Sequence, residues 1–286
     1  MKSSSISSIM DHQLNQCSGH AIPNEKYSYQ LLSSSLRACS YKAKSEKNIF
    51  FVKQFSKKEE MFCLPFKLQK VLLTELSHHE LTPKLIMIDA ENRIIVQEWI
   101  ESGAEIKGLQ EYTLLLEKVS HLHHMPIKTK LKNINLLNIV AHYVSQLKSS
   151  YKDELMSIID EMNFIARQLI EKTTTLVPVH GDFSSINTVL KNERCYLLDF
   201  EYASYAPLEV DFANLIVEDQ IQDPLFSLMK NYFFTLYPDY DFKNLELWLA
   251  FIFLRNNLWR VIHEQKNVES IESEYNDFKA HYNLAV

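Results

Sequence analysis

Glycine is scarce in this chain, with four residues among 286, at positions 19, 103, 108 and 181. Loops that cradle phosphates through their backbone depend on several closely spaced glycines. The sequence therefore excludes a glycine-rich phosphate loop. Gly181 directly precedes Asp182, and we expect it to allow a backbone shape that a side chain would obstruct.

Cysteine and long apolar runs are limited too. The four cysteines, at positions 17, 39, 63 and 195, have no paired spacing, which argues against a disulfide framework or a zinc knuckle. No segment approaches the roughly 20 apolar residues of a membrane-spanning helix, and the first residues do not lead into the apolar core of a signal peptide. The formal charge of −6 argues against a broad nucleic-acid-binding surface. We expect a cytoplasmic protein with no membrane span and no nucleic-acid partner; the oligomeric state stays open.

The composition is that of a globular protein, with 46% apolar and 23% charged residues. Its length suits one large domain or two lobes. Between residues 58 and 76 apolar side chains recur at helical spacing, and Pro65 marks a kink or the start of the helix. Strand composition is found in four stretches: 27–32, 48–55, 85–88 and 93–100.

Beyond residue 101 the apolar spacing becomes helical, with two amphipathic stretches in 135–172 and a helical tail from about residue 208. Residues 177–202 predict a strand, a loop and a strand. We therefore predict an α+β fold with a first lobe at 1–100, built on a small antiparallel sheet, and a mainly helical second lobe at 101–286.

Two acids and an asparagine carry the clearest chemical signal. They lie in Val179-His-Gly-Asp-Phe-Ser-Ser-Ile-Asn-Thr-Val-Leu190 and in Tyr196-Leu-Leu-Asp-Phe-Glu-Tyr202. A kinase centre needs an Asp that takes a hydroxyl proton, an Asn five positions later that binds magnesium, and a further magnesium-binding Asp after the next strand. Asp182, Asn187 and Asp199 fill these positions, so the spacing predicts a phosphotransferase that uses ATP and Mg²⁺.

The competing interpretation is structural, because His-Gly-Asp occurs in ordinary turns and Leu-Leu-Asp at ordinary strand ends. The joint spacing favours the catalytic interpretation. Phosphoryl transfer requires positioning and charge neutralisation. An Asp on a tight loop can orient and deprotonate a hydroxyl, while Asn and Asp oxygens suit a hard divalent cation.

These motifs resemble those of the choline and ethanolamine kinases, within the aminoglycoside phosphotransferase superfamily of the protein-kinase-like fold. The resemblance covers most of the chain. It rests on His180-Gly-Asp-x4-Asn187, on Asp199-Phe-Glu-Tyr-Ala-Ser-Tyr, on Asp211-Phe-Ala-Asn214 and on Glu218. It implies a bilobal kinase for a small amino alcohol, with a nucleotide-binding first lobe.

The resemblance also implies roles for individual residues. Asp182 is the expected catalytic base and contacts the acceptor, while Asn187 and Asp199 bind the metal. Lys53, in Phe51-Val-Lys-Gln, is expected to reach the α- and β-phosphates; otherwise it is a solvated lysine at a strand edge. The segment from Glu98 to Ile100 is expected to hold adenine through its backbone.

Two departures from the family pattern concern the nucleotide. Gln69 stands where a helix glutamate usually pairs with the strand lysine, so a hydrogen bond replaces the ion pair, or Glu59 or Glu60 substitutes. The first-hairpin loop, often glycine-containing in relatives, is the serine-rich segment 33–40. Its hydroxyl groups can still donate to phosphates.

For the acceptor, a quaternary ammonium alcohol needs aromatic faces and a carboxylate. By resemblance Tyr202, Glu218 and Trp259 supply them. A second Trp expected three residues before Trp259 is Asn256, and the Tyr that follows in relatives is displaced to Tyr275 or absent. The aromatic residues could instead pack in the helical core.

Several alternatives to choline stay open. They are ethanolamine, thiamine, an aminoglycoside, or a non-catalytic kinase-like binding module. An aminoglycoside needs a broad acidic cleft, which Asp219, Asp223, Glu264, Glu269 and Glu272 could line, although solvated helix faces explain these acids equally well. Adjacent histidines cannot face one ion on a helix, so His121, His123 and His124 predict a structural role.

Overall fold

The computed structural model describes residues 26–34, 38–56, 63–101, 103, 105–172, 175–264 and 266–285. These divide into two units. The first unit runs to Glu105 and takes in the later segments 127–130 and 189–201, and the second unit contains the rest. Both segments lie beyond the boundary at residue 100 that the hydropathy pattern predicts, so the first unit is not one continuous stretch of sequence.

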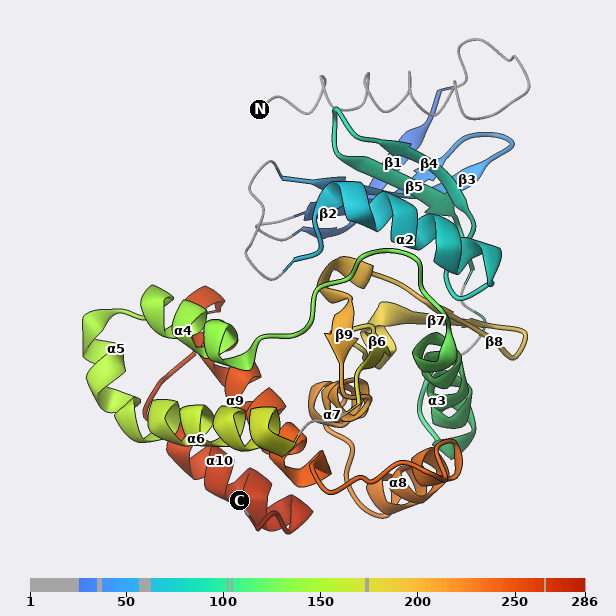
Figure 1. Ribbon diagram of the computed structural model, residues 1–286. Helices are drawn as coiled ribbons and strands as arrows, with labels where there is room; N and C mark the ends of the chain where they lie inside the picture. Colours follow the sequence, from blue (N-terminus) through green and yellow to red (C-terminus); the bar gives the residue numbers. More distant parts are fainter. Residues whose placement is uncertain are drawn as a thin grey trace. The chain divides into compact units, whose positions relative to one another are not determined.

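A five-stranded antiparallel sheet forms most of the first unit (Figure 1). The strand order is β1-β2-β3-β5-β4. In this register Lys53 of β3 lies opposite Ser40 of β2 and Ile95 of β5, so it stands on an interior strand. The strands are β1 (Ser28–Ser34), β2 (Ala38–Lys44), β3 (Ile49–Phe55), β4 (Leu85–Asp89) and β5 (Ile94–Glu98).

One helix, α2 (Phe66–His78), accompanies this sheet and contacts β4. It begins directly after Pro65, whose ring suits the position before the first helical turn, so Pro65 marks the helix start and not a kink. Leu72, Leu73 and Leu76 are buried along one face, as helical spacing predicts. The sheet has its own apolar core of Tyr27, Ala43, Val52, Ile94 and Val96.

The polar stretch after β1 corrects one prediction. Residues 33–40 were expected to form the loop of the first hairpin, yet β1 extends to Ser34 and β2 starts at Ala38. Only 35–37 remain between the strands, and they lie outside the described residues. The composition hid β2 because four of its seven residues are Ala or Lys, which are depleted in strands, while pairing with β1 and β3 satisfies its backbone.

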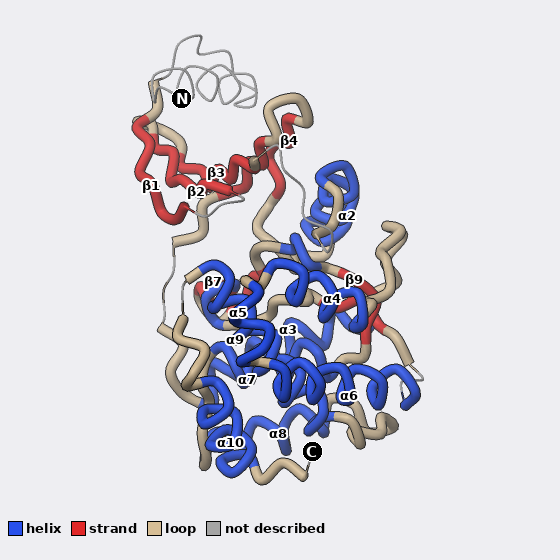
Figure 2. The backbone as a smooth tube through the Cα atoms, turned by 90° about the vertical axis from the view of Figure 1, so that its left-hand side faces the viewer, coloured by secondary structure: helices blue, strands red, loops and turns tan. Residues whose placement is uncertain are grey.

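Helices make up most of the second unit (Figure 2). Its core includes the fully buried Phe212, Phe233, Trp248 and Phe251. Among the described residues, no helix combines the length and hydropathy needed to cross a bilayer. The helices are α3 (Leu109–His124), α4 (Leu136–Gln146), α5 (Ser149–Glu154), α6 (Met156–Lys172), α7 (Glu209–Glu218), α8 (Leu225–Thr235), α9 (Leu245–His263) and α10 (Ile271–Tyr282).

Short strands surround the predicted motif. β6 (Val177–Val179) pairs with β9 (Ser204–Ala206), and the 3-10 turn η1 (Ser185–Asn187) leads directly into β7 (Thr188–Lys191). β7 and β8 (Arg194–Leu197) form a hairpin. Asn192 and Glu193, its two loop residues, have φ of 48° and 62°, which is the left-handed conformation of both central residues in type I′ turns.

The predicted α+β class is confirmed. Among the described residues, the first unit contains a small antiparallel sheet and the helix α2, and the second unit is mainly helical.

Candidate active site

Residues 180–187, hereafter the 180–187 loop, connect β6 to β7 and carry Asp182 and Asn187. Gly181 has a φ of +83°, which L-residues rarely adopt. A side chain there would overlap the backbone carbonyl of Tyr202 and come within 3.1 Å of the Tyr202 Cβ. The expectation that Gly181 allows a conformation closed to other residues is confirmed.

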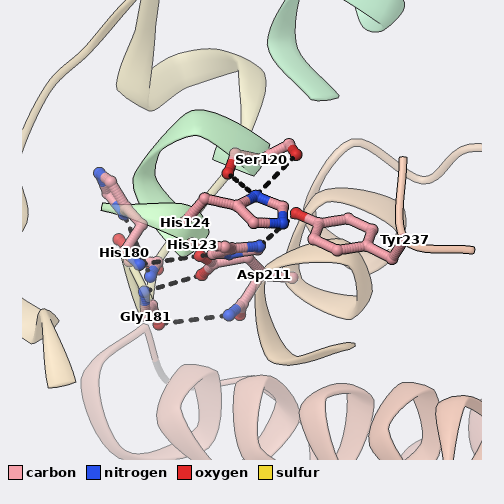
Figure 3. A network of polar contacts seen from close by, with 9 residues as sticks. Ser120, His123, His124, His180, Gly181, Asp211 and Tyr237 are labelled. Carbon is pink, nitrogen blue, oxygen red and sulfur yellow. Dashed lines mark hydrogen bonds and ion pairs between the residues drawn. The ribbon is translucent and has the colours of Figure 1, made fainter. Parts of the chain in front are cut away.

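Asp211, near the start of α7, fixes the start of this loop (Figure 3). Its side chain is fully buried and accepts hydrogen bonds from the backbone N–H groups of His180 and Gly181, each at 2.8 Å. Nε2 of His123 lies 3.0 Å from the same carboxylate. A buried carboxylate with several donors is satisfied without solvent, so Asp211 clamps the backbone directly before Asp182.

His123 is a structural residue, as predicted. It is buried, and its Nδ1 lies 2.5 Å from the Tyr237 hydroxyl while its Nε2 faces Asp211. A neutral imidazole with its proton on Nε2 satisfies both contacts. The neighbouring His124 turns its Nδ1 to Ser120 instead (Figure 3). Within the ranges that the structure describes, no group of three or more His, Cys, Asp or Glu side chains is arranged to hold a metal.

Asp182 and Asn187 contact each other directly. The Asn187 Nδ2 donates to the Asp182 backbone carbonyl at 2.8 Å and to its carboxylate Oδ2 at 2.9 Å. With its amide nitrogen turned inward, Asn187 has its Oδ1 as the group that can act as a metal ligand. The donor chemistry therefore fits a hard divalent cation.

A second carboxylate holds the middle of the 180–187 loop. Asp219, the residue that caps the C-terminus of α7, accepts the Ser185 N–H with both oxygens at 3.2 Å and the Tyr112 hydroxyl at 3.0 Å. Burial raises the pKa of Asp219 above its ordinary value, and the Ser185 and Tyr112 hydrogen bonds oppose that shift. Both ends of α7 thus contribute an acid to the loop.

In the first unit, Lys53 forms an ion-pair cluster. Its Nζ lies 2.5 Å from Oδ2 of Asp199 and 3.7 Å from Oε2 of Glu201, and the Lys53 side chain is only 11% exposed. The alternative of a solvated strand-edge lysine is therefore wrong. Asp199 has a φ of 62°, and a left-handed non-glycine residue costs of order 1–3 kcal/mol, a strain that clusters at functional sites.

Gln69 does not take the position of the missing glutamate. It is buried, and its Nε2 donates to the Leu64 carbonyl at 2.9 Å, because α2 starts after Pro65 and leaves that carbonyl within one helical turn. Among the described residues, Glu201 is a second acid beside Lys53, after Asp199. Glu59 and Glu60 lie outside the described residues.

The segment from Glu98 to Ile100 follows the sheet. β5 ends at Glu98, and Trp99 and Ile100 belong to neither helix nor strand. Their backbone groups are not committed to the sheet ladder, as an adenine-binding segment requires. This assignment stays a prediction.

Glu218, the last residue of α7, meets the face of α9. Asn256 Nδ2 donates to Glu218 Oε1, and Arg260 lies 3.8 Å from Oε2. Trp259 shares this face, since residues three and four apart are neighbours on a helix. Burial raises the pKa of Glu218, the nearby Asp182 and Asp219 raise it further, and Arg255 and Arg260 lower it.

Two aromatic candidates lie in different places. Tyr202 packs its backbone and Cβ against Gly181, next to Asp182. Tyr275, in contrast, is buried in α10, stacks on Phe253 and donates to Glu161. Tyr275 is therefore a core residue.

Of the acids considered for an aminoglycoside cleft, only Asp219 faces the loop. The others are exposed: Asp223, Glu264, Glu269 and Glu272.

Several residues of the site had no assigned role in the sequence. Asp211 and Asn214 were visible as part of a family motif, but the motif does not say that they bind the loop backbone. Glu201 is part of the Asp199 motif, but the sequence does not indicate which residue it contacts. Arg255 and Tyr237 gave no signal, because their contacts join segments far apart in the chain.

Comparison with known proteins identifies the family. The family described as choline/ethanolamine kinase matches residues 28–284. The chain is 26% identical over 184 residues to a Protein LicA homolog of Mycoplasma capricolum subsp. capricolum. The aligned residues cover 64% of this chain and 73% of that protein.

Solved structures are similar in fold. Choline kinase LicA from Streptococcus pneumoniae has a TM-score of 0.78 at 17% identity, over 96% of this chain and 99% of that one. Spectinomycin phosphotransferase, in complex with ADP and spectinomycin, has a TM-score of 0.60 at 14% identity, over 98% and 94% of the two chains. Since the family match runs from β1 to beyond the end of α10, this chain belongs to the choline/ethanolamine kinase family and is a phosphotransferase that acts on an alcohol.

Proposed function

We propose that this kinase uses ATP and Mg²⁺ to phosphorylate the hydroxyl of a choline-like amino alcohol. The observation that carries the proposal is the Asp182–Asn187 pair, held on a loop whose backbone is fixed by Gly181 and Asp211. A general base must be held in one orientation to take a proton in the transition state. Family membership supports the reaction class, and this geometry supports Asp182 as the base.

Asp182 acts as the base in this proposal. One carboxylate oxygen accepts from Asn187, which orients the group and leaves the other oxygen to accept the hydroxyl proton of the acceptor. Half-burial of Asp182 limits competition from water for that proton.

The nucleotide is assigned to a second set of residues. Lys53 would bind the α- and β-phosphates, and the backbone from Glu98 to Ile100 would bind adenine. Asn187 and Asp199 would hold Mg²⁺, which neutralises phosphate charge when bound. Gln69 is assigned an indirect role, because its amide holds the Leu64 carbonyl at the start of α2.

The cationic group of the acceptor is assigned to Glu218, Tyr202 and Trp259. A carboxylate supplies charge, and aromatic faces attract a quaternary ammonium through cation–π contact. Two acids at the C-terminal end of a helix are unfavourable with the helix dipole, and both Glu218 and Asp219 are also partly buried. Such a costly arrangement is expected where a cation binds.

Ethanolamine is the second candidate, on one observation. Asn256, in place of a second aromatic residue, puts a polar amide against Glu218. The amide offers no aromatic face to a quaternary ammonium, whereas a primary ammonium can donate its N–H groups to the Glu218 carboxylate itself.

ADP release tests the proposal across choline, ethanolamine, thiamine and an aminoglycoside, each with wild type and Asp182→Ala. We expect turnover with choline or ethanolamine and its loss in the variant. Turnover only with thiamine or the aminoglycoside would reject the acceptor assignment. No turnover on any substrate would favour a binding module, and turnover that survives in Asp182→Ala would reject the base.

A further inference from the structure

A continuous hydrogen-bonded chain links Glu218 to the 180–187 loop. Asn214 Nδ2 donates to the Gly181 carbonyl at 3.2 Å. Arg255 Nη2 donates to Asn214 Oδ1 at 2.8 Å. Arg255 also donates to Asn256 Oδ1, from Nε at 2.8 Å and from Nη2 at 2.7 Å. Asn256 Nδ2 completes the chain by donating to Glu218 Oε1.

Donor and acceptor roles are fixed for every residue in this hydrogen-bonded chain. Asn214 is fully buried and Asn256 is 6% exposed, so neither amide can exchange its partners for water. A guanidinium can only donate, which turns both amide oxygens toward Arg255 and both amide nitrogens away from it. One amide nitrogen therefore points to Gly181 and the other to Glu218.

Asn256 also separates the charges. An Arg in direct contact with a carboxylate tends to form two parallel hydrogen bonds and to occupy both oxygens. Here the neutral amide stands between Arg255 and Glu218, so Arg255 acts on the carboxylate through its field while only Oε1 is occupied by this chain. Oε2 keeps its lone pairs, with Arg260 at 3.8 Å, beyond hydrogen-bond distance.

We propose that Arg255 and Asn256 are positioning residues for the cationic group of the acceptor: they orient Glu218 toward it and join Glu218 to the backbone that carries Asp182. The inference rests on the proposed function and adds two residues that touch neither substrate. Binding of the acceptor and alignment of the base then depend on one guanidinium.

The charged groups around Glu218 predict in which direction its pKa should change when one of them is removed. Arg255 and Arg260, both on α9, favour its ionised form, while Asp182 on the loop and Asp219, the C-cap residue of α7, oppose ionisation. Glu218 must be ionised to attract a cation. Removing the Arg255 charge should therefore move the rising limb of the pH profile of kcat/KM for the acceptor to higher pH.

The experiment measures that profile for wild type, Arg255→Met, Arg255→Lys and Asn256→Asp, with ATP saturating. For Arg255→Met we expect about a tenfold fall in kcat/KM for the acceptor at pH 7 that shrinks toward pH 9, with the KM for ATP within about twofold. Arg255→Lys keeps the charge and should keep the limb in place, while its kcat falls about threefold because the forked contact to Asn214 and Asn256 is lost.

Asn256→Asp should move the rising limb of the kcat/KM profile to higher pH, as Arg255→Met should. The new carboxylate takes the Arg255 fork and removes the donor to Glu218 Oε1. Lys266→Met is the matched control, since Lys266 contacts Asn257 and Glu274 on the α9–α10 side; it should leave the profile unchanged. A wild-type profile in both Arg255→Met and Asn256→Asp, with both folded, would overturn the proposal.

A readout without turnover separates this inference from the proposed function. In ¹³C-glutamate-labelled protein, Glu218→Gln identifies the Glu218 carboxyl resonance, whose titration is then compared between wild type, Arg255→Met and Arg255→Lys. We expect a higher pKa in Arg255→Met and a smaller change in Arg255→Lys. An identical titration in all three would reject the coupling, even in an active enzyme. If wild type phosphorylates no acceptor while the titration shifts, the proposed function fails and the coupling stands.

Discussion

In the first unit Lys53 is held by charge, between Asp199 at 2.5 Å and Glu201 at 3.7 Å. In the second unit the 180–187 loop is held by stereochemistry and by buried hydrogen bonds: Gly181 fills a position closed to side chains, and Asp211 binds two consecutive N–H groups. An ion pair tolerates changes of distance, because Coulomb attraction falls slowly. Buried hydrogen bonds and steric contacts do not.

The difference suggests a division of tasks. A proton must leave a hydroxyl along one line, so the base needs a rigid loop. A triphosphate carries charge over many oxygens, and the point charge of an ammonium can attract several of them without one fixed geometry. Substitutions around the 180–187 loop should therefore lower stability and activity together, whereas substitution of Lys53 should lower the use of ATP with little effect on folding.

The largest effect is expected from Asp211→Ala. It leaves two backbone N–H groups and His123 without their buried acceptor, which should cost about 3–5 kcal/mol in the free energy of unfolding, together with most of the activity. Urea unfolding and ADP release measure both quantities. Asp211→Asn, which keeps one acceptor oxygen, should lose less of each.

Asp223→Ala is the matched control for this prediction. Asp223 is an exposed aspartate that accepts from Ser227, and its loss should lower the free energy of unfolding much less than the loss of Asp211. If Asp211→Ala were no more destabilised than this control, the rigid-loop account would be wrong.

Next in size is Gly181→Ala. The methyl group meets the Tyr202 carbonyl, and the backbone is left-handed, so we expect about 2–3 kcal/mol of destabilisation and a large fall in kcat. Gly103→Ala is the control, because the nearest atoms to its added Cβ are 3.9 Å away. Thermal unfolding of both variants should separate them clearly; equal midpoints would show that the loop can relax.

A smaller effect is expected from Lys53→Met. This substitution removes charge-assisted contacts to the phosphates, which contribute about 2 kcal/mol to binding. The loss should reduce kcat/KM for ATP about 30-fold. The unfolding midpoint should change little. Lys42→Met removes a lysine whose partner Glu101 is largely exposed, and such a surface pair contributes little. Steady-state kinetics with ATP varied would contradict the account if both variants behaved alike.

The smallest effect concerns pH and Glu209→Gln. Burial raises the pKa of this fully buried carboxyl, which accepts from Tyr240 through Oε2 and has no hydrogen bond to Oε1. The pKa of Glu209 is therefore higher in the folded than in the unfolded protein. Its contribution to stability is complete below the unfolded pKa and is lost as pH rises through the folded pKa. The stability of Glu209→Gln relative to wild type should therefore increase from pH 5 to pH 8, by on the order of 1 kcal/mol. Urea unfolding of Glu209→Gln and wild type at both pH values measures this trend, and a difference that stays constant would contradict it.

Local patterns predicted much of the fold. The strands β3, β4 and β5 and the start of α2 were visible in composition and in Pro65, because their signals lie within each segment. β2 was missed because four of its seven residues are Ala or Lys, which are depleted in strands, and its order comes from pairing with β1 and β3. α5 was missed because none of its residues is buried, so it has no apolar period.

The site divides in the same way. The positions of Asp182, Asn187 and Asp199 follow from spacing, since the chemistry requires those residue types at those intervals. The contacts that support them do not: Asp211 lies 29 residues after Asp182, and Arg255 lies 41 residues after Asn214. Only the folded chain brings such residues together.

The central claim is that Asp182 transfers a proton from an amino-alcohol hydroxyl during phosphorylation. ³¹P NMR of reactions with ATP and choline or ethanolamine, for wild type and the nearly isosteric Asp182→Asn, tests it most directly. The account predicts a phosphate monoester from one of these alcohols with wild type and about a 1,000-fold lower rate with the variant. A monoester that forms at a similar rate in both proteins, or no monoester with wild type, would contradict it.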